Sequence, residues 1–157
     1  MTDRLKPGSL KTASDLFQKV RRDAALLDGE VNSDRFFNFV VTAYSLIDWI
    51  RHDPSVPASA KAQGAIDGLY NDQWLRLCGD AATGAKHFTL THRTPTADKV
   101  SVASGWGVGR FGKGPYGVGE ERITVHLPGG PVYGALELVA GVLKVWETFF
   151  TNHGIPI

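Results

Sequence analysis

Apolar residues recur every three or four positions between Thr12 and Leu27. This spacing places them on one face of a helix and predicts a short amphipathic helix. Thr12 or Ser14 is suited to cap its start, because a hydroxyl oxygen can accept a hydrogen bond from a free backbone N–H of the first turn. Gly29 follows the predicted end of the helix, as glycine often does.

The next segment is apolar around most of its circumference. Its sequence, FFNFVVTAYSLIDWIRH, occupies positions 36–52. Ser33 or Asp34 is predicted to cap this second helix, and Asp53-Pro54 ends it, because the residue before a proline disfavours helical geometry. The polar residues form a single stripe, consisting of Asn38, Thr42, Ser45, Asp48 and His52. A helix of this kind is typical of the middle of a bundle.

Three further segments have helical character. Residues 58–72 predict a weaker third helix, because Gly64 and Gly68 each lower helicity by about 1 kcal/mol relative to alanine. A fourth helix is expected from Asp72 to about Lys86. The last is expected to begin with Pro131 near its first position, where proline is well tolerated, and to end near Asn152 or Gly154.

The hydrophobic period changes between the fourth and last helices. FTLTHR at 88–93, KVSVAS at 99–104 and RITVHL at 122–127 alternate apolar with polar or small residues. Alternation with a period of two predicts β-strands, here arranged as a small antiparallel ribbon. Seven glycines fall between Gly105 and Gly119, so the ribbon carries a long glycine-rich loop.

These elements predict a single domain over residues 1–157 that is mainly α. We expect a bundle of about five helices, with the β-ribbon inserted at 88–128 and a loose lead-in at 1–11. A chain of this length buries roughly 70% of its unfolded surface and needs no disulfide or metal to fold. The predicted core consists of Phe36, Phe37, Phe39, Val40, Tyr44, Ile47, Trp49, Ile50, Leu75, Leu77, Leu136, Val139, Val142, Leu143, Trp146 and Phe150.

The apolar content also bears on partners. The second and last helices carry more large apolar side chains than one small bundle readily hides, which favours a homodimer. The net charge is +1, so no overall field attracts nucleic acid or an anionic membrane. The apolar run at 131–150 contains Glu137, Lys144 and Glu147, which argues against a membrane span.

A single cysteine, Cys78, excludes an internal disulfide and favours a reducing compartment. The N-terminal segment lacks the apolar stretch of a signal peptide. A cytoplasmic location is therefore expected. Cys78 itself is predicted to be a core residue, because it lies one turn from Trp74 on the apolar side of its helix.

The segment WLRLCGDAATGAKHF at 74–88 holds the candidate catalytic residues. Arg76, Asp80 and His87 lie along one face of the predicted fourth helix, with roughly 16 Å of helix rise between Arg76 and His87. Arg76 and Asp80 are spaced for an intrahelical ion pair. Asp48 on the second helix is the predicted partner of His87 if the two polar stripes face each other, although such a stripe can also be a solvated edge.

A helical bundle with a polar motif that ends in histidine resembles the HEPN group of helical, often dimeric prokaryotic proteins. The resemblance implies a metal-independent RNase in a toxin or defence system, with His87 as acid or base. In that group an arginine precedes the histidine by four to six intervening residues, whereas this chain has Asp80, Ala81 and Ala82 at those positions. Because Arg76 lies outside this spacing, the resemblance implies RNA binding or altered RNase chemistry.

The glycine-rich loop suggests a different function. Gly107, Gly109 and Gly112 match G-x-G-x-x-G, but the loop does not run into a helix, as a phosphate cradle requires. Its aromatic and cationic residues instead suit contact with single-stranded nucleic acid or a protein. The candidate partner-binding residues are Trp106, Arg110, Phe111, Lys113 and Tyr116. Alternatively, these aromatic side chains fold back and cover the apolar end of the bundle.

No metal or cofactor is expected. His87, His92 and His126 could converge only if the ribbon folded beside the fourth helix, and their spacing matches no metal motif. Two functions therefore remain open from the sequence: a HEPN-like protein that binds or cleaves RNA, and a non-enzymatic homodimeric interaction module that uses the aromatic, glycine-rich ribbon.

Overall fold

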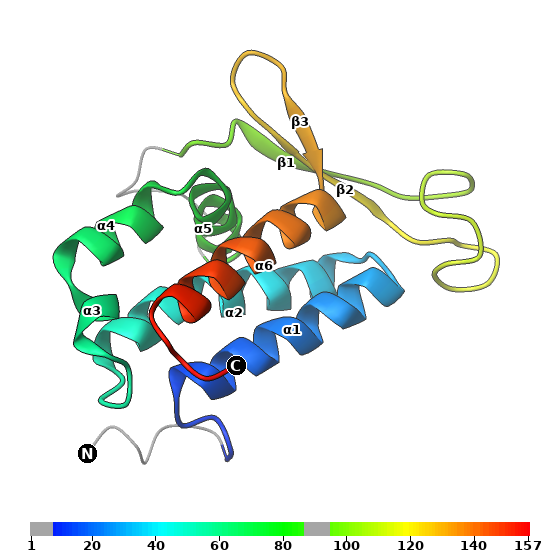
Figure 1. Ribbon diagram of the computed structural model, residues 1–157. Coiled ribbons are helices and arrows are strands. Elements are labelled where there is room, and N and C mark those ends of the chain that lie inside the picture. The colour runs from blue at the N-terminus through cyan, green and yellow to red at the C-terminus, as the bar shows by residue number, and fades with distance from the viewer. Residues whose placement is uncertain (1–7, 87–94) are drawn as a thin grey trace.

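A computed structural model describes residues 8–86 and 95–157. It confirms a mainly helical fold with a small antiparallel sheet inserted before the last helix (Figure 1). The helices and strands of these residues are α1 (Ala13–Gly29), α2 (Ser33–His52), α3 (Ala58–Lys61), α4 (Gln63–Asn71), α5 (Gln73–Lys86), β1 (Lys99–Ala103), β2 (Arg122–His126), β3 (Val132–Gly134) and α6 (Ala135–Asn152).

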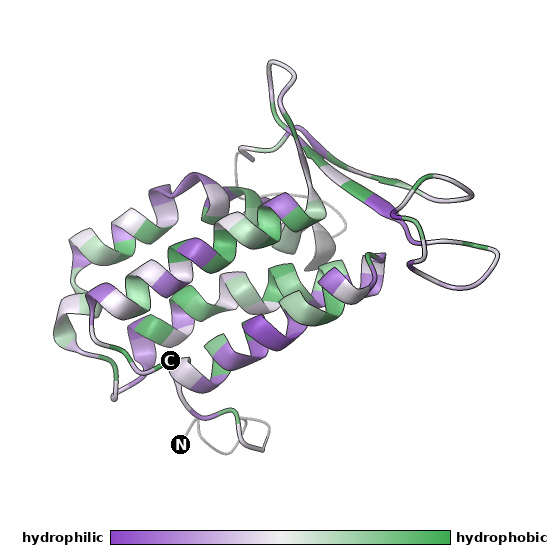
Figure 2. Ribbon diagram, turned by 45° about the vertical axis from the view of Figure 1, so that its right-hand side comes forward, coloured by the Kyte–Doolittle hydropathy of each residue, from purple (hydrophilic) through white to green (hydrophobic). Residues whose placement is uncertain are grey.

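The bundle is organised around α2, which packs against both α1 and α5, while α6 lies against α1 and α5. The short helices α3 and α4 are at the end of the bundle opposite the sheet (Figure 1). Figure 2 shows that α6 is hydrophobic along most of its length, whereas α1 is strongly hydrophilic on one side. The largest fully buried side chains include Phe17, Phe39, Trp146 and Phe150. The central position predicted for the second helix is therefore confirmed.

Most of the predicted core is buried or packs against buried residues. Phe37 is the exception, because 42% of its surface is exposed. Phe37 lies near the start of α2, where it lines a groove and does not take part in the packing that was expected. Cys78 is buried as predicted, and its Sγ lies 3.5 Å from the carbonyl oxygen of Val40.

Several helix boundaries differ from those predicted. Thr12 caps α1 as expected, but Asn32 caps α2, since its side chain accepts a hydrogen bond from the N–H of Arg35 at 2.9 Å. The third segment divides into α3 and α4 because Ala62 between them is extended, with ψ of 144°. These differences are local and leave the order of elements unchanged.

The last helix begins at Ala135 rather than near Pro131. Residues Val132–Gly134 form β3, which pairs with β2 and places Val125 opposite Tyr133. The residues after Pro131 therefore complete a sheet before the helix starts. Because β3 has three residues, it is too short to show hydrophobic alternation in the sequence. The apolar run at 131–150 therefore predicted a single helix.

The sheet has the order β1-β2-β3 and is antiparallel throughout. KVSVAS and RITVHL form β1 and β2 as predicted, with Val102 opposite Ile123, while FTLTHR lies outside the described residues. Ile123 of β2 is buried, whereas Val100 and Val102 of β1 are 40% and 51% exposed. Within the described residues, no helix combines the length and apolar character needed to cross a membrane.

The junction of α5 and α6 depends on a glycine. A Cβ atom at Gly141 would lie 2.2 Å from Cδ2 of Trp74, well inside contact distance. The Trp74 ring in turn packs against Tyr133, with ring centroids 4.9 Å apart. The absence of a side chain at Gly141 thus lets α5 approach α6 and hold the end of the sheet against the bundle.

We expect Gly141→Ala to lower the free energy of unfolding by about 1–2 kcal/mol. Overpacking against Trp74 costs about 1–3 kcal/mol, and the gain in helix propensity offsets up to about 1 kcal/mol of this. Gly68→Ala on α4 is the control, because a Cβ there meets nothing within 4 Å, and it should stabilise by up to about 1 kcal/mol. Urea denaturation measures the unfolding free energy of both variants. Equal changes at the two positions would contradict the close contact between Gly141 and Trp74.

Candidate functional site

The predicted catalytic residues do not form one site among the described residues. Asp48 and His52 are a surface pair, with Oδ1 of Asp48 3.2 Å from Nδ1 of His52 and side chains 71% and 67% exposed. Asp80 lines a groove that also includes Phe37. Asp48 lies roughly 17 Å further along α2 than Phe37, so the polar stripe of α2 does not bring Asp48 to Asp80.

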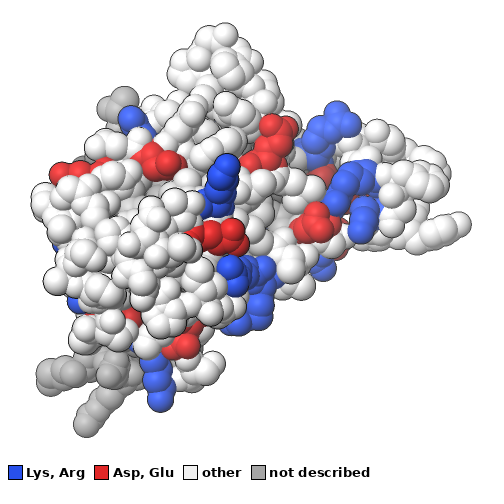
Figure 3. All heavy atoms as spheres, viewed as in Figure 1, with Lys and Arg blue, Asp and Glu red and all other residues white. Residues whose placement is uncertain are grey.

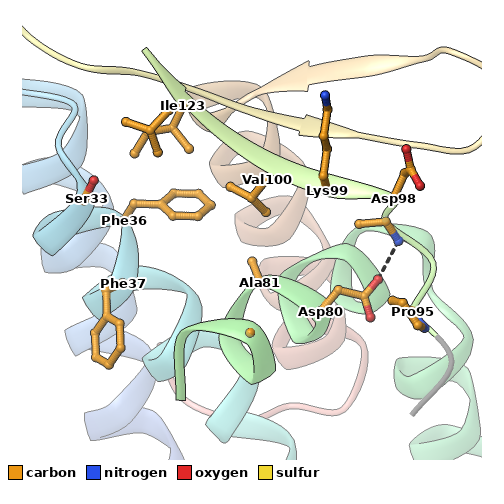
Figure 4. Close-up of a pocket in the computed structure, with 13 residues that line it drawn as sticks. Ser33, Phe36, Phe37, Asp80, Ala81, Pro95, Asp98, Lys99, Val100 and Ile123 are labelled. Atoms are coloured by element: carbon orange, nitrogen blue, oxygen red, sulfur yellow. Dashed lines mark hydrogen bonds between the residues drawn. The ribbon is translucent and has the colours of Figure 1, made fainter. Parts of the chain in front are cut away.

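Asp80 is buried and has a structural role. Its Oδ2 accepts hydrogen bonds from the N–H groups of Thr96 and Ala97, each at 2.7 Å, and Figure 4 shows the bond to Ala97. The carboxylate thereby holds the segment that enters β1 against α5. Arg76 is exposed one turn earlier on α5, and His87 lies outside the described residues.

The described residues show no metal centre. No group of three or more histidine, cysteine, aspartate or glutamate side chains in residues 8–86 and 95–157 is arranged to hold an ion. His126, one of the histidines considered from the sequence, lies 3.1 Å from the hydroxyl of Thr124 through its Nε2.

The glycine-rich loop forms a projecting arm, defined here as residues 104–119. It connects β1 to β2 and extends away from the bundle (Figure 1). The side chains of Trp106, Phe111 and Tyr116 are 89%, 104% and 105% exposed. The alternative in which these aromatic side chains cover the apolar end of the bundle is therefore wrong.

A buried carboxylate at the base of the arm fixes its position. Glu120 is 3% exposed. Its Oε1 accepts hydrogen bonds from the backbone N–H and Nε of Arg110 at 2.8 and 2.7 Å. Its Oε2 accepts from the N–H of Val31 at 2.9 Å and from Nη2 of Arg110 at 3.1 Å. One side chain thus ties the middle of the arm to the turn between α1 and α2.

These contacts make Glu120 a stronger acid. Burial alone would raise its pKa, but the hydrogen bonds from the Arg110 side chain and from the N–H groups of Val31 and Arg110 outweigh it and lower the pKa from 4.5 to about 2. The same hydrogen bond raises the pKa of Arg110. Both groups are therefore charged at neutral pH.

The sequence grouped Arg110 with the candidate partner-binding residues, but in the structure its guanidinium is paired with Glu120. Besides Glu120, its Nη2 donates to the carbonyl oxygen of Asp28 at 2.5 Å. The guanidinium is directed inward at the arm's base and its charge is matched by Glu120. Lys113, in contrast, is exposed. Of the five predicted partner-binding residues, the arm presents Trp106, Phe111, Lys113 and Tyr116 to solvent.

Two glycines allow the chain to wrap around Glu120. A Cβ at Gly109 would lie 2.3 Å from Cγ of Glu120, and one at Gly114 would lie 2.4 Å from its backbone nitrogen. Gly114 also has φ of +80°, which disfavours other residues. Within the arm, Nε1 of Trp106 donates to the carbonyl oxygen of Gly117 at 3.1 Å. The glycines therefore give the arm a defined shape.

The neighbouring residue fastens the arm to α2. Oε2 of Glu121 accepts hydrogen bonds from the N–H and the hydroxyl of Ser33, each at 2.6 Å. Its own N–H donates to the carbonyl oxygen of Val31 at 3.0 Å. Glu120 and Glu121 are neighbours in the chain, and both accept hydrogen bonds from residues at the turn between α1 and α2.

An apolar groove of about 450 Å³ runs beside β1 (Figure 4). The ring of Phe36 points toward Val100 across it. Its walls come from the start of α2, the end of α5, β1 and Ile123 of β2. Its apolar lining includes Phe36, Phe37, Ala81, Val100, Val102 and Ile123. No local pattern in the sequence marks this groove, because its residues come from four separate segments.

The surface charge is mixed. On the face shown in Figure 3, Lys and Arg lie among Asp and Glu, and the far end of the arm is almost entirely uncharged. Fold and site together define a helical bundle that carries a structured, aromatic β-hairpin arm. Comparisons with known protein families, curated proteins and solved structures give no match to this chain.

We expect Glu120→Gln to lower the free energy of unfolding by roughly 2–3 kcal/mol at neutral pH. All four hydrogen bonds run from N–H donors to the carboxylate, so an amide NH₂ would face donors and leave Arg110 without its counter-charge. Glu147→Gln is the control, because its pair with Arg21 is half exposed and should contribute less than about 1 kcal/mol. Urea denaturation gives both values.

The low pKa of Glu120 predicts an acid-dependent loss of stability. Folding lowers the pKa of the Glu120 carboxylate from 4.5 to about 2. Its charged form therefore stabilises the fold fully at pH values above 4.5, and this stabilisation is lost as the pH falls from 4.5 toward about 2. The difference in unfolding free energy between the native chain and Glu120→Gln should therefore shrink between these two pH values. A difference independent of pH would show that the charge of Glu120 is not responsible.

Proposed function

We propose that this protein is a non-enzymatic interaction module that binds a partner protein through the aromatic tips of its arm. The observation that carries the proposal is the near-complete exposure of Trp106, Phe111 and Tyr116 on an arm whose base is fixed by buried hydrogen bonds. Exposed single apolar residues are common on protein surfaces, whereas several large ones exposed on one short, ordered segment are typical of an interaction site.

The order of the arm supports binding rather than chance exposure. Ordering a glycine-rich segment is entropically costly, yet this chain holds it with Glu120, Glu121 and close glycine contacts. An arm ordered before binding loses less entropy when a partner docks, so more of the contact energy appears as affinity. Aromatic side chains are also the residues most enriched at the energetic centres of protein interfaces.

The charge of the arm favours a protein partner over nucleic acid. Binding to a phosphate backbone depends on several accessible cations. Arg110 is paired with Glu120 and Asp28, which leaves Lys113 as an exposed cation of the arm. Bases stack on exposed aromatic rings with little sequence preference, so the experiment includes RNA as an alternative outcome.

The test is photo-crosslinking in the producing cell. The photoreactive residue benzoylphenylalanine replaces Phe111 at the tip of the arm, and in a matched control it replaces Leu26, which is 55% exposed on α1. We expect a discrete adduct at position 111 that resists nuclease and is removed by protease. The control should give no adduct of the same size.

Two results would contradict the proposal. Equal labelling at positions 111 and 26 would mean that the arm is not a docking surface. An adduct that disappears on ribonuclease treatment would mean that the partner is RNA and would favour the HEPN-like alternative. In that case, loss of RNA cleavage in a His87→Ala variant would be the next measurement.

A further inference from the structure

We infer that the arm's partner is a second copy of this chain, and that the arm of each copy docks in the apolar groove beside β1 of the other. This inference rests on the proposed function and specifies its partner. It assigns an occupant to the groove, whose lining among the described residues includes Phe37, Val100 and Val102, each at least 40% exposed.

The groove matches the tips of the arm in chemistry and size. Its lining is apolar, with Phe36, Val100, Val102 and Ile123 among its residues. An enclosed apolar cavity of about 150 Å³ accommodates one benzene ring. The volume of about 450 Å³ is therefore of the order needed by three rings, which is the number of exposed aromatic side chains that the arm carries.

The topology allows exchange between copies but not within one chain. The groove runs along β1, and the arm begins at Ser104, just beyond the end of that strand, and leads away from the bundle (Figure 1). β1 is an edge strand of the described sheet and spans roughly 17 Å. A two-fold axis at the Ala103 end of β1 would set two copies end to end and antiparallel, so that each arm runs back along the partner's β1.

The contact would be large enough for a stable dimer. Large aromatic side chains bury about 150–250 Å² each. Three rings from each of two arms would bury about 900–1,500 Å². Together with the groove surface that they cover, this area falls within the range of stable protein interfaces.

The decisive experiment mixes two defective variants of the full chain. The arm variant carries Trp106→Ser, Phe111→Ser and Tyr116→Ser, and the groove variant carries Val102→Glu. A dimer of either variant alone has no intact arm facing an intact groove. In a mixed dimer, the intact arm of the groove variant can dock in the intact groove of the arm variant. Sedimentation equilibrium measures the mass of each sample, and Leu26→Lys on α1 is the surface control.

We expect the native chain and the Leu26→Lys control to sediment at twice 17.0 kDa. Each defective variant should show a dimer dissociation constant raised at least about tenfold, because central aromatic residues dominate interface energetics. The mixture should recover dimers that neither variant forms alone. A monomeric native chain, a dimer insensitive to the arm variant, or a mixture without recovery would overturn the inference.

A second measurement does not depend on the groove variant folding. The purified chain with benzoylphenylalanine at position 111 should form an adduct of twice its own mass, and the labelled peptide should come from 33–37 or 95–103 of the other copy. An adduct to a different protein at position 111, with the purified chain monomeric, would overturn the second copy as partner and leave the proposed function intact. Absence of any adduct at position 111, in the cell and with the purified chain, would contradict both the proposed function and the second copy as partner.

Discussion

The buried carboxylate of Glu120 is the interaction on which the shape of this molecule depends beyond its helical bundle. Four hydrogen bonds converge on it from Val31 and Arg110, which joins the first helical pair to the middle of the arm. Burying a charge is costly unless it is paired and fully hydrogen-bonded, and here every contact supplies a donor. The arm's direction is therefore set by the bundle.

This anchoring explains how an arm rich in glycine can present large apolar side chains. The glycines let the backbone pass within contact of Glu120, and the aromatic side chains project from the turns that result. Arg110, which the sequence grouped with those aromatic residues, belongs to the anchor and balances the charge of Glu120. The exposed surface of the arm is thus more apolar than the sequence suggested, which supports the proposed protein partner over a nucleic acid.

The polar residues of α5 and α2 contribute to architecture in the described structure. Asp80 holds the entry to β1 by two backbone hydrogen bonds, and this contact helps to form one wall of the groove. Asp48 lies on the exposed side of α2 with His52. The resemblance to HEPN proteins stays a prediction, since His87 lies outside the described residues. Tertiary folding creates the groove beside β1, and the arm projects from the end of the same strand.

The sequence by itself determined the elements whose signals are local. Helical spacing identified α1, α2 and α5, and alternation identified β1 and β2, because each pattern is contained in one continuous segment. The clustered aromatic side chains also marked the arm. Only the tertiary structure decided that β3 precedes α6, that Arg110 faces Glu120, that Phe37 is exposed and that a groove lies beside β1. These features arise from contacts between distant residues, such as Val31 with Glu120, which no local pattern encodes.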